Sequence, residues 1–333
     1  MIPVFSARHV EAAVSPERAV DAVREAFAAY ARGEWSMPPK VYVAAYPAGD
    51  FRAMPALGAG HALLKWVTSF PGNPARGLPT VTGLVLLSDA SDGSLRAALD
   101  AGSVTALRTG AAAVLAAEEL GRPDAETAAV LGAGVNGRAA AKTFLARGRE
   151  VMLWDVDAER ARAAADELGA TLAESREEAL AADLLVTVTP GHEILLPAGS
   201  LKAGQHVSLM GADGPGKAEI AVEELARTHI VCDDRGQSGP SRTLDANARV
   251  RLYADDWEQA SHNGDLAHGV AAGAIDEDDV TQLGDVLAGT ALGRQSPDDI
   301  TIFDSTGLAI QDLAIALAAV ERVRLLDLPT IEL

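Results

Sequence analysis

The sequence is short of cysteine and aromatic residues, and each shortage excludes a class of protein. Cys232 is the only cysteine in 333 residues, which excludes an intrachain disulfide and a cysteine-based zinc site. Aromatic residues make up 4% of the chain and apolar residues 48%, so we expect aliphatic strands and alanine-faced helices. A chain of this length can form two domains with sizeable cores.

Basic charge is also scarce. The chain has 28 Lys and Arg against 47 Asp and Glu, a formal net charge of −19, which argues against nucleic acids and anionic membranes as partners. An acidic surface poor in lysine is typical of proteins that stay soluble at high salt, and we hypothesise a halophilic source. An acidic protein from a GC-rich mesophile is the alternative. The five lysines are Lys40, Lys65, Lys142, Lys202 and Lys217.

Long apolar runs are missing. No window approaches 18 uninterrupted apolar residues, which excludes a membrane-spanning helix. The first ten residues, M-I-P-V-F-S-A-R-H-V, lack the basic start and the long apolar stretch of a signal peptide. We therefore expect a cytoplasmic protein.

The clearest motif present is a glycine-rich turn. A short apolar run ends at Leu131, and Gly132, Gly134 and Gly137 follow as G-x-G-x-x-G before an alanine-rich helical run. A second apolar strand then ends at Asp155. This order is typical of a dinucleotide site, in which the glycines allow the turn and the helix N-terminus faces the pyrophosphate. An acidic residue at this position favours NAD over NADP, because it accepts from a ribose hydroxyl and repels a 2′-phosphate.

Further apolar runs predict a doubly wound parallel sheet of the Rossmann type. They are L-L-V-T-V-T, H-V-S-L-M, T-H-I-V-C-D-D and I-T-I-F-D. The run H-V-S-L-M leads into G-A-D-G-P-G-K, which places Asp213 and Lys217 in a loop at the carboxyl end of a strand. There Asp213 is either a turn former or a candidate general base. In the helix expected after Val156, Arg160 and Arg162 are predicted to be solvated.

The first third of the chain predicts a smaller α+β domain. A helix is expected over residues 15 to 32, capped by Ser15, and short β runs between residues 37 and 87 predict an antiparallel or mixed sheet. Lys65 interrupts an apolar strand and points either outward or into a pocket, where burial would lower its pKa. In the helix expected over residues 103 to 120, Arg108 lies near the start and grips a carboxylate or phosphate, or forms a surface ion pair. The break G-R-P-D at 121 to 124 marks the expected boundary.

Two segments near the C-terminus are expected to differ in burial: the first is solvated and the second is packed. His262, Asp265 and His268 have spacings that allow a metal, but no thiolate or H-E-x-x-H accompanies them. We therefore expect a solvated loop there and no metal site. After Ser305, Leu313 and Leu317 lie on one apolar face of a last helix, which we expect to pack against the N-terminal half.

Five ordered segments together resemble the ornithine cyclodeaminase/μ-crystallin family, which includes archaeal-type alanine dehydrogenases. They are K-W-V-T-S-F-P-G-N-P-A-R-G-L-P-T-V-T-G, T-A-L-R-T-G-A-A, L-G-A-G-V-N-G, G-A-D-G-P-G-K and I-T-I-F-D-S-T-G-L-A-I-Q-D. The resemblance implies an NAD-binding domain over residues 122–305. It also implies a substrate-binding and dimerisation domain over residues 1–121, completed by residues 306–333, and a homodimer.

The resemblance also implies roles for single residues. Lys65 matches the active-site lysine and Asp213 the catalytic acid/base, while Arg108 matches an arginine shared by the substrate carboxylate and the cofactor. Thr306 matches a position beside the substrate. Lys40 stands where the family has a substrate-binding arginine, and a lysine lacks the bidentate fork. The positions that match NAD contacts, besides the three glycines, are Thr80, Val135, Asn136, Asp155, Thr189, Met210, Lys217 and Ser305.

These matches favour an NAD-dependent dehydrogenase that converts L-alanine, or a similar small amino acid, to the 2-oxo acid and ammonia. The alternative within the family is an ornithine cyclodeaminase, which would form L-proline and ammonia with NAD used catalytically. A ketimine reductase and a non-catalytic, crystallin-like binding protein are further alternatives.

Overall fold

The computed structural model describes residues 1–191, 193–212, 214, 216–229 and 249–332. The chain divides into two compact units. Unit 1 comprises Met1–Ala112 and Gly307–Leu333, and unit 2 comprises Ala113–Thr306. The sequence predicts the first boundary at the G-R-P-D break, but it falls within helix α3 (Ala101–Leu120), because the alanine-rich run keeps this helix continuous up to Leu120.

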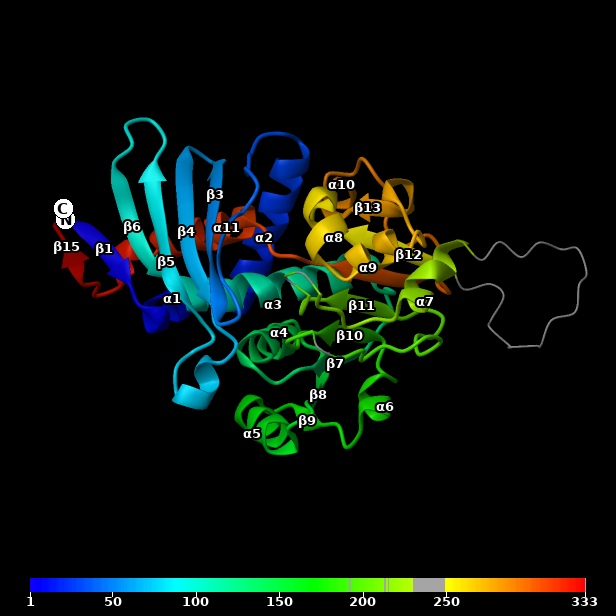
Figure 1. Cartoon of the computed structure of the whole chain (residues 1–333). Helices are drawn as coiled ribbons and strands as arrows, with labels where there is room; N and C mark the ends of the chain where they lie inside the picture. The colour runs from blue at the N-terminus through cyan, green and yellow to red at the C-terminus, as the bar shows by residue number, and fades with distance from the viewer. Residues whose placement is uncertain (192, 213, 215, 230–248, 333) are drawn as a thin grey trace, which may run out of the picture. The chain divides into compact units, whose positions relative to one another are not determined.

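Unit 1 is built on a seven-stranded mixed sheet. Its order is β15-β1-β6-β5-β4-β3-β2, with β1 parallel to β6 and antiparallel to β15. The first and last strands are thus neighbours, and the two chain ends lie side by side (Figure 1). The strands are β1 (Ile2–Phe5), β2 (Val41–Ala45), β3 (Gly49–Gly58), β4 (His61–Ser69), β5 (Val81–Asp89), β6 (Leu95–Asp100) and β15 (Thr330–Ile331).

Helix α2 (Pro16–Ala31) of unit 1 begins where the sequence predicts. There the Ser15 side chain accepts from the Arg18 N–H, and Pro16 takes the first helical position. Helix α11 (Ala309–Val320) packs against α2 and against β3, β4 and β5, which confirms the expected return of the last helix to the N-terminal half. The remaining helical segments are α1 (Ala7–Ala13), η1 (Asn73–Arg76) and η4 (Val323–Leu325).

The two faces of this sheet differ in polarity and exposure. Residues directly opposite each other in an antiparallel ladder share a face. The row Met54–Lys65–Val85–Leu99 is buried throughout. The row Val41–Ala53–Trp66–Leu84 lies on the other face, where Trp66 is 42% and Leu84 51% exposed.

Unit 2 is built on an eight-stranded parallel sheet of order β13-β12-β14-β11-β10-β7-β8-β9. The first strand of this sheet in the sequence is β7, and β8 and β9 follow it on one side. The next strand, β10, pairs with the other side of β7. The carboxyl ends of β7 and β10 therefore form the topological switch point, where such sheets bind ligands. The strands are β7 (Thr127–Leu131), β8 (Glu150–Trp154), β9 (Thr171–Leu172), β10 (Leu184–Thr187), β11 (His206–Leu209), β12 (Val250–Ala254), β13 (Val280–Gln282) and β14 (Ile300–Asp304).

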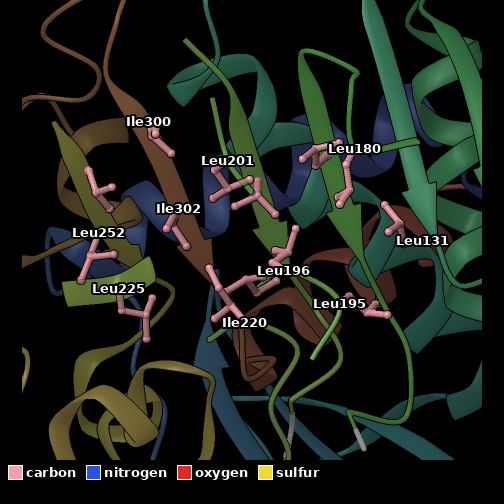
Figure 2. Packing of buried hydrophobic residues seen from close by; sticks show 14 of the residues in the cluster. Leu131, Leu180, Leu195, Leu196, Leu201, Ile220, Leu225, Leu252, Ile300 and Ile302 are labelled. Carbon is pink, nitrogen blue, oxygen red and sulfur yellow. The ribbon is translucent and has the colours of Figure 1, made fainter. Parts of the chain in front are cut away.

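The core on one face of this sheet is aliphatic. The partners Leu252 and Ile302 on β12 and β14 lie in it, and Leu196, Ile220 and Leu225 cover them from the connecting segments (Figure 2). No helix in the described ranges is long and apolar enough to cross a membrane. The helical segments are α4 (Val135–Ala146), α5 (Ala158–Leu168), α6 (Arg176–Ala179), α7 (Val222–Leu225), η2 (Ala226–His229), α8 (Trp257–Asn263), α9 (Leu266–Ala271), η3 (Glu277–Asp279) and α10 (Leu283–Leu287).

The predicted strand T-H-I-V-C-D-D runs mostly outside the described residues, since its positions 230 to 234 are not described and its first two residues belong to η2. The other predicted strands of unit 2 are present. The predicted α/β fold class, with a parallel sheet and a smaller mixed-sheet unit formed by both chain ends, is confirmed.

Candidate active site

The glycine motif forms a tight turn between β7 and α4. Gly132 has a φ of +114°, and a Cβ there would lie 2.6 Å from the Val188 carbonyl oxygen. A Cβ at Gly137 would collide with the Gly132 carbonyl. A Cβ at Gly134 would instead meet nothing within 4 Å. The turn therefore closes tightly on itself and leaves open space where α4 begins, as a pyrophosphate requires.

Asp155 follows β8 directly and is bonded to the same turn. Its Oδ2 accepts from the Ala133 N–H at 2.7 Å and its Oδ1 from the Asp157 N–H at 2.9 Å. Arg162 is exposed as expected, but Arg160 is not merely solvated, because its guanidinium lies 3.3 Å from Asp155 Oδ1. The carboxylate thus lies directly after the second strand, where the sequence predicts an acid that recognises a ribose hydroxyl.

Glu219 ties together the strand ends beside this turn. One carboxylate oxygen accepts from the Thr189 N–H at 2.8 Å and the Thr189 hydroxyl at 2.6 Å. The other accepts from the Thr187 hydroxyl at 2.7 Å and the Gly211 N–H at 2.9 Å. Burial raises the pKa of Glu219. This side chain therefore fixes the carboxyl ends of β10 and β11, where the predicted cofactor residues Thr189 and Met210 lie.

Two more buried carboxylates follow, with Asp265 beside Glu219 and Asp304 beside Asp265. Asp265 Oδ1 accepts from the N–H groups of Glu219 at 2.6 Å and Ile220 at 3.2 Å, and Asp304 Oδ2 accepts from the Leu266 N–H at 2.9 Å. Burial, together with the charge of Glu219, raises the pKa of Asp265 to about 7. Burial and the charge of Asp265 raise the pKa of Asp304 well above its usual range.

Ser305 and Thr306 follow β14 and are oriented by one carboxylate. The Ser305 hydroxyl donates to Asp255 Oδ2 at 3.0 Å, and the Thr306 hydroxyl donates to Asp255 Oδ1 at 3.2 Å. Asp255 is buried and follows β12 directly. The two hydroxyls that the resemblance places beside cofactor and substrate are thus held by a neighbouring strand end.

The segment that holds His262, Asp265 and His268 is not the solvated loop that the sequence predicts. The two histidines lie in α8 and α9. Asp265, between these helices, is buried and accepts from the two backbone N–H groups described above. His262 bonds locally to Ser261, and His268 Nε2 lies 2.8 Å from the Lys217 carbonyl oxygen. Within the described ranges, no group of three or more His, Cys, Asp or Glu residues could hold a metal ion.

In unit 1, Lys65 points to the buried face of the sheet. The side chain is 1% exposed, and its Nζ donates to Asp312 Oδ1 at 2.8 Å. Burial lowers the pKa of Lys65 to about 8, while the Asp312 charge opposes this change and the Arg108 charge contributes to it. Of the two orientations open from the sequence, the inward one is observed.

Arg108 lies two turns into α3, which begins at Ala101. The sequence suggests that the helix N-terminus reinforces its charge, but that effect fades within the first turn. Its Nη1 donates to Gln311 Oε1 at 3.4 Å, and its Nε lies 3.8 Å from Asp312 Oδ1. The side chain is largely buried, which rules out the surface ion pair. Gly307 has a φ of +77°, and a Cβ there would lie 2.7 Å from the Arg108 guanidinium.

The other predicted residues lie at the starts of elements. Lys40 directly precedes β2 and Thr80 directly precedes β5, and both are half-buried. Val135 and Asn136 form the first turn of α4, with Val135 strongly exposed beside the open space at Gly134. These positions remain predictions for substrate and cofactor binding.

The predicted catalytic residue Asp213 lies outside the described residues. Further along the chain, the carbonyl oxygen of Lys217 contacts His268, and the buried Glu219 follows two residues later.

Sequence reasoning missed Asp312 and Gln311, which complete the polar cluster around Lys65 and Arg108. A usable signal was present, because Gln-Asp interrupts the apolar run I-Q-D-L-A-I-A-L just as Lys65 interrupts its strand. Glu219 was also missed. Nothing in its local sequence distinguishes it from a surface acid, since its four donors come from segments distant in the sequence.

Comparison with known proteins shows what the chain resembles. The model of the ornithine cyclodeaminase/mu-crystallin family matches residues 3–325. An alanine dehydrogenase of Archaeoglobus fulgidus is 39% identical over 322 residues, which cover 94% of this chain and 92% of that protein.

Two solved structures share the fold over nearly the whole chain. One is described as an archaeal alanine dehydrogenase dimer with bound NAD; it has a TM-score of 0.85 and 38% identity and covers 97% of this chain and 96% of its own. The other is a Thermococcus litoralis Δ1-pyrroline-2-carboxylate reductase in complex with NADH and L-proline; its TM-score is 0.87 at 25% identity, with 99% and 100% covered. These matches confirm the family resemblance and the fold class.

Proposed function

The chain belongs to the ornithine cyclodeaminase/mu-crystallin family, and on that premise we propose that it is an NAD-dependent amino-acid dehydrogenase. It converts L-alanine, or a similar small amino acid, to the 2-oxo acid and ammonia through an imino acid. The observation that carries this proposal is the similarity to an archaeal alanine dehydrogenase, which extends over nearly the whole of both chains.

Unit 2 provides the residues that would hold NAD. The open space at Gly134 and the first turn of α4 suit the pyrophosphate, and Asp155 suits the adenosine ribose. Thr189, Met210 and Ser305 line the strand ends on the same edge, where the resemblance places further cofactor contacts. When bound, NAD supplies the acceptor for the hydride that leaves the substrate Cα.

Unit 1 provides cationic groups for the substrate carboxylate. Lys65 and Arg108 are two cations that share one carboxylate, Asp312, so positive charge remains for an anionic group. Arg108 offers the fork that binds carboxylates, and Lys40, in place of the family arginine, adds a point charge. This surplus suits a substrate with a carboxylate group, such as an amino acid.

Asp213 would act as the acid–base group. It takes a proton from water while the water oxygen attacks the imino carbon, and it returns that proton to the nitrogen. As the C–N bond breaks, the new hydroxyl group gives its proton back to this acid–base group and becomes the carbonyl of the 2-oxo acid, and ammonia leaves. Thr306, held by Asp255, would orient the substrate.

A cyclodeaminase would share the first step but use the side-chain amine of ornithine as the nucleophile. Product analysis separates the two reactions. With NAD and L-alanine, a dehydrogenase forms NADH and ammonia in equal amounts. With NAD and L-ornithine, a cyclodeaminase forms proline and ammonia without net NADH. The second result without the first would overturn the proposal, and assays at low and at molar salt would test the hypothesis of a halophilic source.

We further propose that the protein is a homodimer joined through the exposed face of the unit 1 sheet. Val41, Trp66 and Leu84 form one exposed apolar row across β2, β4 and β5. Beside it, Phe51 stacks on Trp66 with ring centroids 5.7 Å apart. An apolar patch of this kind on a sheet marks an interaction surface, and a second copy offers the same patch.

Sedimentation of the protein tests this surface. The native chain is expected to sediment as a dimer at micromolar concentration, and Trp66→Glu with Leu84→Glu as a monomer. A native protein that remains monomeric would contradict the proposal, as would a variant that remains dimeric.

A further inference from the structure

Asp312 is an acid in the first turn of an apolar, buried helix. In α11 the residues around it are mostly alanine, leucine and isoleucine, and Asp312 itself is 0% exposed. Burying a carboxylate is costly unless a partner compensates it. The position therefore points to a specific partner.

That partner is the Lys65 ammonium. Asp312 Oδ1 accepts from Lys65 Nζ at 2.8 Å, and the same oxygen lies 3.8 Å from Arg108 Nε. The pair joins β4 to α11, which pack against each other. A lysine on a flexible four-carbon stem is thus held at a single place on the buried face.

The second oxygen of Asp312 is unused. Asp312 Oδ2 and Arg108 Nε have no hydrogen-bond partner among the residues that the structure describes. A buried polar atom without a partner is costly. Within the described residues, the printed partners of this carboxylate are the two cations beside it.

We propose that Asp312 is a positioning residue for Lys65: its carboxylate fixes the place of the ammonium and keeps it charged at neutral pH. The inference rests on the proposed function in one respect: the Lys65 ammonium, once positioned, holds the substrate carboxylate. No contact between Asp312 and substrate is required.

The charged groups that face Lys65 come from three elements. Asp312 on α11 favours its charged form, whereas Arg108 on α3 and Arg52 on β3 oppose it, as does burial. Arg52 is itself paired with Asp50 at 2.6 Å. Asp312 is thus the group that counteracts the other three effects, and its removal lowers the pH at which Lys65 loses its proton.

The direct test follows the five lysines by NMR after selective ¹³Cε labelling, with Lys65 assigned by its absence in Lys65→Met. In the native protein the Lys65 signal should titrate with a pKa of about 8. In Asp312→Asn it should titrate at a pH lower by about one pH unit or more. Asp312→Ser is a second charge-removing variant if the first does not fold. Glu321→Gln, which removes an exposed acid just after α11, is the matched control and should change nothing.

Activity gives an independent readout. If the pKa of Lys65 falls by about one pH unit, the ratio of Asp312→Asn to native kcat/KM should fall about tenfold between pH 6 and pH 9, because Lys65 loses its charge earlier. Asp312→Glu, which retains the charge, should restore the native profile.

A Lys65 signal that titrates alike in the native protein and in both charge-removing variants would overturn the proposal, and so would a ratio that does not vary with pH. If no amino acid is oxidised, the proposed function fails, but the titration still decides the role of Asp312.

Discussion

The cluster of Lys65, Arg108 and Asp312 in unit 1 and the cluster of acids around Glu219 in unit 2 use charge in opposite ways. In unit 1, Lys65 and Arg108 surround a single acid, Asp312, with opposite charges in contact. In unit 2, Glu219, Asp265 and Asp304 are all acids, and backbone N–H and hydroxyl groups supply their donors.

This difference separates a binding site from a scaffold. The oxygens of Glu219 are fully used by four donors at the strand ends, so this acid holds the cofactor edge in shape and offers nothing to a ligand. In the unit 1 cluster, the two cations Lys65 and Arg108 outnumber their one acid, Asp312, and leave N–H donors for a substrate. Changes in the Lys65–Arg108–Asp312 cluster should therefore affect activity first, and changes in the cluster of acids around Glu219 should affect stability first.

The largest effect is expected at Lys65. Lys65→Met should lower kcat/KM for the amino acid by about a thousandfold, roughly 4 kcal/mol, because it removes the buried cation from the substrate site. Lys202→Met, at an exposed lysine, is the matched control and should leave kcat/KM unchanged. Steady-state kinetics that show equal kcat/KM for Lys65→Met and native protein would remove Lys65 from the site.

Glu219→Gln should act on stability. The amide nitrogen cannot accept, so two donors at the ends of β10 and β11 lose their partner, and the free energy of unfolding should fall by about 2–4 kcal/mol. Urea denaturation measures this, with Glu223→Gln as the exposed control. If both variants unfold at the native midpoint, Glu219 does not hold the edge.

Asp265→Asn should raise the free energy of unfolding at pH 8, whereas Glu219→Gln lowers it. The pKa of Asp265 is about 7 in the folded chain against a usual value of 3.8. The folded state therefore binds more protons than the unfolded state between these values, and stability falls as pH rises from about 4 to 7. An asparagine cannot acquire this charge, so the free energy of unfolding of the variant should exceed that of the native protein by about 1–3 kcal/mol at pH 8.

The increase in the free energy of unfolding that Asp265→Asn causes should become smaller towards pH 4. Its presence at pH 8 and loss near pH 4 would distinguish the charge effect from a change in packing, and urea denaturation at the two pH values measures it. Equal or lower stability of the variant at pH 8 would show that the acid is better compensated than its contacts indicate.

Asp155→Ser should have the smallest effect. Loss of the carboxylate removes repulsion of a 2′-phosphate and leaves Arg160 nearby, so the preference for NAD over NADP should fall about tenfold, roughly 1.4 kcal/mol. The ratio of kcat/KM for the two cofactors measures this preference. An unchanged ratio would mean that Asp155 serves only its two backbone N–H groups.

Local patterns in the sequence predict one cluster much better than the other. Lys65 and Arg108 can be inferred because charge interrupts apolar runs, and the glycines because their spacing is tied to one turn. Glu219 and Asp265 could not be found in this way, since many of their partners are backbone N–H groups brought together by the parallel sheet. The long-range bond that Asp265 accepts from the Glu219 N–H likewise has no local sequence signal, so the sequence wrongly predicts its segment to be a solvated loop. Asp213, the predicted base, stays a prediction.

Hydride transfer from the substrate Cα to NAD is the central step of the proposed function. The most direct measurement supplies NAD with L-alanine deuterated at C2 and follows the label by mass spectrometry. One deuterium in each NADH formed, with equal amounts of ammonia and 2-oxo acid, is the expected result. NADH without deuterium, or no NADH from any small amino acid tested, would contradict it.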